Sequence, residues 1–146
     1  MPERDALGRF LPQNRPSAST PRQIRVVLSA VDQMVGSVIT KIVLDTLSNL
    51  TDDPRRGGTP VDTGWASSNW QLGVGRRPSG VLGSPDSVPR GEADVGPVLR
   101  YTIKDGPVWV ANNVPYISRL NDGYSQQAPA GFIQRAVQKA VSDLAT

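Results

Sequence analysis

The chain has 146 residues, enough for one domain of ordinary size, with 38% hydrophobic residues and a formal net charge of +3. It contains no cysteine and no histidine, which excludes disulfides, thiolate metal sites and catalytic schemes that depend on an imidazole. We therefore expect no catalytic or metal-binding residues and no cofactor. With 14 Gly and 13 Pro, we expect a small core with long loops.

Residues 1–19 predict an extended N-terminal arm. Three prolines and Gly8 prevent a helix, and no hydrophobic periodicity is present. Leu7, Phe10 and Leu11 form an apolar cluster, which we expect to contact an adjacent subunit. The alternative is a disordered tail. The segment carries acidic residues and lacks an apolar run, so we do not expect a signal peptide.

Residues 20–50 predict one long helix, which begins a single domain that runs from residue 20 to residue 146. Thr20, Pro21 and Gln23 supply an N-cap, a proline in the first turn and a capping-box partner. Apolar residues then recur at helical spacing over about 28–30 residues, or roughly 45 Å. A domain of this size covers such a stripe only in part, so we expect some of it to meet a neighbouring chain. No apolar run approaches a length of about 18 residues, so no membrane span is expected.

A loop at residues 51–59, a tight turn at residues 60–64, one helical turn and a strand that begins near Trp70 come next. Asp52 and Asp53 suggest either a metal site or a solvated cap of the long helix, and the cap is favoured because no other carboxylate cluster accompanies them. We expect Asp62 to cap the turn through its side chain and Gly64 to adopt positive φ.

The same turn contains Asp62-Thr63-Gly64, the signature of aspartic proteases. That chemistry needs two carboxylates that share a proton, which a chain with one signature supplies by dimerising. Pro60 lies where the protease has an apolar strand, so the simple turn is favoured and a retropepsin-like protease remains the alternative.

Residues 75–91 predict a long protruding loop rich in glycine and proline. Its arginines, Arg76, Arg77 and Arg90, face DNA phosphates, carboxylates of a neighbouring subunit, or solvent. A net charge of +3 does not by itself establish a nucleic-acid binder, so a DNA-binding module is a further alternative.

The remaining pattern predicts a short helix within residues 92–104, a central strand at 108–111, a short helix at 116–121 and a C-terminal helix that begins at Pro129. The fold class is therefore α+β, with a long N-terminal helix and a C-terminal helix packed on a small β-sheet. Trp109 is expected on the opposite side of the sheet from the core. The predicted core comprises Trp70, Val108, Val110, Phe132, Val137, Val31, Val35 and Val38.

Two stretches carry a distinctive pattern of residues. The first reads Thr59-Pro60-Val61-Asp62-Thr63-Gly64 and continues through a short polar segment to Trp70. The second contains Asn112-Asn113-Val114-Pro115-Tyr116, Leu120, Gly123-Tyr124-Ser125 and Gln127-Ala128-Pro129-Ala130-Gly131. Both resemble segments of the tail-completion, or neck, proteins of tailed bacteriophages. The chain departs from that family's pattern at Asn121, where the family usually has Glu, and in the arginine-bearing insertion at residues 75–91.

The resemblance implies a structural virion protein without enzymatic activity. Subunits of this kind assemble into a homo-oligomeric ring at the neck or the top of the tail, where head and tail are joined. The implied neighbours are other copies of the chain and the adjacent connector or tail-tube proteins, with non-specific proximity to packaged DNA and no membrane. The protein would be made in the cytoplasm of the host bacterium.

Overall fold

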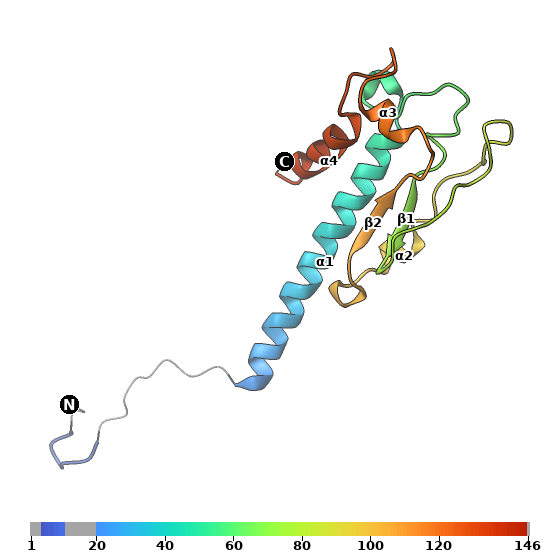
Figure 1. Ribbon diagram of the computed structural model, residues 1–146. Helices are drawn as coiled ribbons and strands as arrows, with labels where there is room; N and C mark the ends of the chain where they lie inside the picture. Colours follow the sequence, from blue (N-terminus) through green and yellow to red (C-terminus); the bar gives the residue numbers. More distant parts are fainter. Residues whose placement is uncertain (1–3, 11–19, 146) are drawn as a thin grey trace. The chain divides into compact units, whose positions relative to one another are not determined.

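The computed structural model describes residues 4–10 and 20–145. The chain divides into two compact units, Met1–Val31 and Asp32–Thr146, and each is described by itself. The elements, shown in Figure 1, are α1 (Pro21–Thr51), the 3₁₀ helix η1 (Pro54–Arg56), β1 (Gln71–Val74), α2 (Gly96–Leu99), the 3₁₀ helix η2 (Ile103–Asp105), β2 (Val108–Ala111), α3 (Ile117–Asn121) and α4 (Phe132–Asp143).

The predicted start of α1 is confirmed in atomic detail. The Thr20 backbone N–H donates to Gln23 Oε1 at 2.9 Å, and the Gln23 N–H donates back to Thr20 Oγ1 at 3.3 Å. This reciprocal pair satisfies two backbone donors at the helix N-terminus. With Pro21 in the first turn, the helix runs for 31 residues, close to the predicted length.

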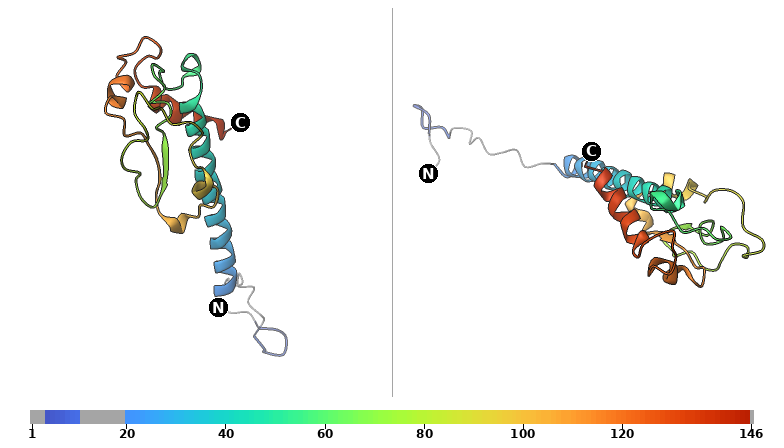
Figure 2. Two further views of the ribbon diagram at one scale, coloured as in Figure 1. Left: turned by 90° about the vertical axis from the view of Figure 1, so that its right-hand side faces the viewer. Right: turned by 90° about the horizontal axis from the view of Figure 1, so that it is seen from above.

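The sheet consists of two antiparallel strands, β1 and β2, with Leu72 opposite Val110. Because it has only two strands, β2 is not the central strand that its apolar sequence predicted. Val110 packs on the core, whereas Trp109 is 39% exposed, which confirms that Trp109 faces the other side. Figures 1 and 2 show this sheet and α4 beside α1.

The core of the second unit lies at the C-terminal end of α1. Leu50 packs there with Trp70, Ala128, Phe132 and Ala136, so the predicted burial of Trp70 and Phe132 is confirmed. The rest of the predicted core is partly wrong. Val31, Val35, Val38 and Val137 are all at least 40% exposed. Two four-residue strands are too short to cover α1 at Val35 and Val38, and Val137 lies on the outer side of α4, away from the buried Ala136 and Ala140.

Two predicted helices have different bounds from those expected. The segment 92–104 does not form one helix but the short α2 and then η2, because Thr102 between them is extended. The Asp105 carboxylate accepts from the Thr102 N–H and so caps η2. The C-terminal helix begins at Phe132 rather than at Pro129, since Gly131 precedes it in the left-handed region with φ of 84°.

Candidate assembly surface

In the first unit, α1 exposes a series of large apolar side chains. Leu28 is 57% exposed and Val27 is 61% exposed, and Ile24, Val26 and Val31 range from 44% to 63%. Exposed single apolar residues are ordinary, but a run of them along one helix is typical of a surface that binds a protein, a membrane or a ligand.

In the second unit, the same helix has one buried side and one exposed side. Gly36, Val43, Thr46 and Leu50 are buried. Thr40 Oγ1 donates to the Val98 carbonyl at 3.3 Å, and Asn49 Nδ2 donates to the Ala136 carbonyl at 3.0 Å. These contacts fix the C-terminal part of α1 to its own unit.

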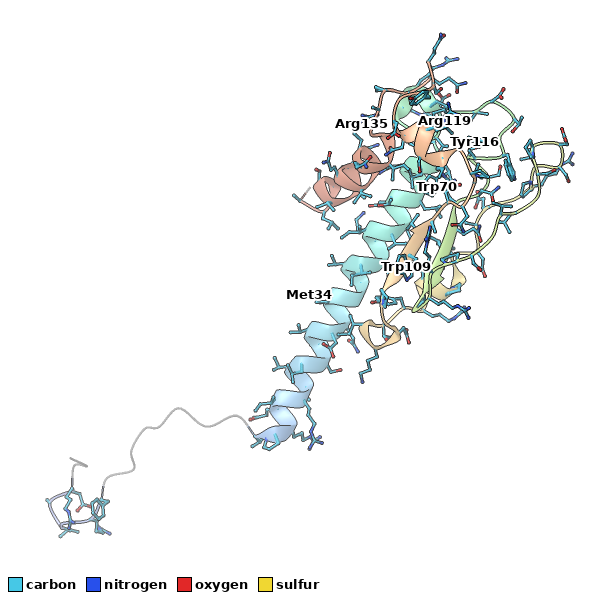
Figure 3. The ribbon with its side chains drawn as sticks, in the orientation of Figure 1. Met34, Trp70, Trp109, Tyr116, Arg119 and Arg135 are labelled. Atoms are coloured by element: carbon cyan, nitrogen blue, oxygen red, sulfur yellow. The ribbon has the colours of Figure 1, made fainter. Side chains whose placement is uncertain are left out.

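The exposed side in this unit carries Met34, Val35 and Val38. Met34 is 62% exposed, and Figure 3 shows it pointing away from the sheet. On α4, Val137 and Val141 are 41% and 49% exposed, while Ala136 and Ala140 on the inner side are buried. Both helices of the unit therefore present apolar side chains to solvent. We refer to the exposed apolar residues of α1, from Ile24 to Val38, as the α1 apolar face.

The two stretches with the distinctive pattern are joined through side-chain amides and hydroxyls. Gln127 Oε1 accepts from the Val61 N–H at 2.8 Å, and Gln127 Nε2 donates to the Val61 carbonyl at 2.6 Å. Asn112 Nδ2 donates to the Ala66 carbonyl at 2.8 Å. Within the first stretch, Trp70 Nε1 donates to the fully buried Thr59 Oγ1 at 2.8 Å. Residues far apart in the sequence thus form one rigid corner of the unit.

The loop at residues 75–91 is exposed over most of its length, as predicted, but it is anchored to the domain. Asn69, which is fully buried, donates through Nδ2 to the Leu82 carbonyl at 3.0 Å and accepts from the Leu82 N–H at 2.7 Å. Asn113 Nδ2 donates to the carbonyls of Pro78 and Gly80. These anchors could not be predicted from the sequence, because Asn69 occupies a position that alternates with the apolar residues of the strand.

The three loop arginines are all exposed. Arg77 donates to Asn113 Oδ1 at 3.2 Å, so it is partly held by the domain. Arg76 lies one residue before it and Arg90 lies at the far end of the loop.

The turn that contains Asp62 differs from the prediction in its cap. Gly64 has φ of 88°, as expected, but Thr63 Oγ1 accepts from the Trp65 N–H at 3.2 Å. Within the described residues, no hydrogen bond involves the exposed Asp62 carboxylate, so the predicted Asp62 cap is wrong. Thr63 takes that role because its hydroxyl lies two residues before the N–H, as in an ST-turn. A cavity of about 60 Å³ beside the turn contains one carboxylate, that of Asp62.

Asp52 and Asp53 organise the chain after α1. Asp53 Oδ1 accepts from the Arg55 N–H at 2.8 Å, and Asp52 Oδ1 lies 2.8 Å from Arg56 Nη2. The backbone N–H of Asp53 and the Arg56 guanidinium lower the pKa of the Asp52 carboxyl below its ordinary value. Across residues 4–10 and 20–145, no group of three potential metal-ligating side chains is found.

In the arm, residues 4–10 form a closed turn rather than a purely extended segment. Asp5 Oδ1 accepts from the N–H groups of Leu7 and Arg9, both at 2.9 Å, and Gly8 has φ of 74°. The Arg4 guanidinium lies 4.2 Å from the centre of the Phe10 ring. Leu7 and Phe10 are 76% and 63% exposed. Leu11, the third residue of the predicted contact, is outside the described residues.

A groove of about 490 Å³ lies between α1 and the segment that leads into α2. Its apolar walls come from Leu44, Leu47, Trp70 and Val95. Glu92 supplies the one charge among its described lining residues. Its polar lining comprises Ser48, Thr51, Ser67 and Ser68. The sequence alone did not indicate this groove, because three separate segments build it.

By length and composition, α1 is also apolar enough to cross a membrane, with a mean hydropathy of 1.6 in its most apolar stretch. A search for unbroken apolar runs misses this property because Asp32 and Lys41 interrupt the pattern. However, Gly36 is the first buried residue of α1. The preceding part of the helix spans roughly 22 Å at 1.5 Å per residue, which is shorter than a hydrocarbon layer of about 30 Å.

Comparison with known proteins gives no match. No family model, no curated protein and no solved structure is significantly similar to this chain.

Proposed function

We propose that this protein is a structural subunit that assembles into a homo-oligomeric ring in the neck or upper tail of a tailed bacteriophage, where it joins head to tail. The observation that carries the proposal is the α1 apolar face. Fully burying one such side chain is worth about 1.5–3 kcal/mol, so an exposed set of this size favours association.

The spacing of the α1 apolar face favours a helix as its partner. Ile24, Leu28, Val31, Val35 and Val38 follow one another in alternating steps of four and three residues. This spacing places apolar residues along the seam between helices that pack side by side. The helix also carries the polar residues Asp32 and Gln33, whereas a helix surrounded by lipid would be apolar on all sides.

The sequence resemblance supplies the biological setting, and the rigid corner formed by the two stretches supports it. The two stretches that resemble neck proteins hold each other through Val61 and Gln127, and through Ala66 and Asn112. Such a corner gives each subunit a fixed shape, which a ring of identical copies requires. With its single carboxylate, the Asp62 turn favours a structural role over a protease, whose chemistry needs two carboxylates that share a proton.

The test compares two neighbouring residues of α1. Met34→Glu introduces a charge into the α1 apolar face, and we expect it to weaken self-association at least tenfold, because it removes an apolar contact and buries a charge. Gln33→Glu is the matched control, since Gln33 is also exposed but polar, and it should assemble like the wild type. Sedimentation velocity and electron microscopy measure the assembly.

The biological role is tested by complementation. A phage that lacks the protein should accumulate separate heads and tails, and the wild-type protein or Gln33→Glu should restore joined particles. Met34→Glu should fail while retaining the helical circular dichroism of the wild type. A wild-type protein that stays monomeric, or a Met34→Glu variant that assembles normally, would refute the proposal.

A further inference from the structure

We infer that the arm turn of one copy, residues 4–10, docks through Phe10 into the groove beside Trp70 of a neighbouring copy. The inference rests on the proposed ring, because the ring supplies the neighbour. It adds a specific donor and a specific receiving site to that proposal.

The arm turn is preformed for contact with another surface. The Asp5 carboxylate accepts hydrogen bonds from two backbone N–H groups of the turn, and the Asp5 backbone is bonded to the backbones of Gly8 and Arg9. Little further ordering of the turn is therefore needed on docking. The turn nevertheless leaves Leu7 and Phe10 largely exposed. A turn that is ordered yet buries neither of its large apolar side chains is suited to bury them against a partner.

The groove matches this turn in size and in chemistry. Its volume of about 490 Å³ lies in the range of protein sites that enclose small ligands, and its apolar walls suit an aromatic ring. Trp70 is 5% exposed and forms a rigid part of the wall, because Nε1 is bonded to Thr59. An aromatic pair of Phe10 and Trp70 would add to the burial of apolar surface.

The charges of the two surfaces are opposite. Arg4 stacks on the Phe10 ring, so the ring and a guanidinium reach the groove together. Glu92 is the charge that the groove offers, and it is exposed. An Arg–carboxylate pair at the rim fixes orientation and register more than affinity.

The closing experiment uses the absence of cysteine in the natural chain, which leaves introduced thiols as the only ones. Two full-length variants, Ala6→Cys and Ser48→Cys, are mixed and oxidised, and the cross-linked dimer is measured on a non-reducing gel. Ala6 is an exposed residue of the arm turn, so Ala6→Cys leaves Phe10 and Arg4 in place. Ser48 lines the groove and is exposed, so Ser48→Cys is a mild change. Val81→Cys on the exposed loop replaces Ser48→Cys in the control mixture.

We expect the Ala6→Cys and Ser48→Cys mixture to give at least tenfold more dimer than the control mixture, and replacing Phe10 by Ala in the Ala6→Cys chain to abolish that excess. Glu92→Arg should lower that yield severalfold, and adding Arg4→Glu to the partner chain should restore it. Equal yields in both mixtures would overturn the inference. A link formed only within one chain that carries both cysteines would also overturn it, because the arm would then occupy its own groove.

Sedimentation of the same samples separates this inference from the proposed function. Rings that form without the specific cross-link would refute the arm contact and leave the ring intact. A specific cross-link in samples that form no closed ring would support the arm contact and refute the ring.

Discussion

Phe132 offers the sharpest test of the fold. Its side chain is fully buried and packs with Leu50 of α1 and Trp70, so it joins three segments of the second unit. Phe132→Ala loses about 1.5–3 kcal/mol of apolar transfer free energy. The cavity that remains raises the expected loss in the free energy of unfolding to about 3–5 kcal/mol. A domain of this size has a total stability of about 5–15 kcal/mol, so the variant should be close to unfolding.

The assay is urea denaturation followed by tryptophan fluorescence, at concentrations at which sedimentation shows the protein to be monomeric. Val137→Ala is the control on the same helix, because Val137 is 41% exposed and should cost less than about 1 kcal/mol. A Phe132→Ala loss as small as that of Val137→Ala would refute the packing of α4 on α1 and Trp70.

Two further predictions concern the loop and the end of α1. Asn69→Ala should lower the free energy of unfolding by about 1–3 kcal/mol, because it leaves the Leu82 N–H without its partner. The loosened loop should be cleaved faster by trypsin at Arg90, and cleavage at the wild-type rate would contradict this. The lowered pKa of Asp52 means that its carboxylate stabilises the fold above the ordinary pKa of 3.8, and that this contribution is lost as the pH falls through the lowered value. Asp52→Asn should therefore lower the urea midpoint at pH 6 more than at pH 3, and an equal difference at both pH values would argue against the ion pair with Arg56.

The sequence predicted the helices better than it predicted what covers them. The capping residues and the helical spacing were enough to place α1, because these signals are local. The same spacing did not distinguish Val38, which is exposed, from Val43, which is buried, since both lie among regularly spaced apolar residues. Whether these valines are buried depends on how many strands the sheet has. The sequences of two short strands do not show how many further strands pair with them.

The arm and the groove show the same limit at the candidate site. The exposure of Leu7 and Phe10 followed from the composition of the arm, but the turn closed by Asp5 did not. The groove depends on the approach of α1, residues 67–70 and residues 91–95. Its existence is a property of tertiary packing, and no single segment predicts it.

The amide anchors of the 75–91 loop have a consequence for how the loop responds to salt and pH. Asn69, Gln71 and Asn113 hold the loop through neutral donors to backbone carbonyls. Neutral hydrogen bonds are weakened little by dissolved salt and do not titrate between acidic and alkaline conditions, unlike pairs of charged side chains. The loop should therefore keep its position as salt concentration and pH change, whereas the contacts of its charged side chains, Asp86 and the three arginines, weaken as the ionic strength rises.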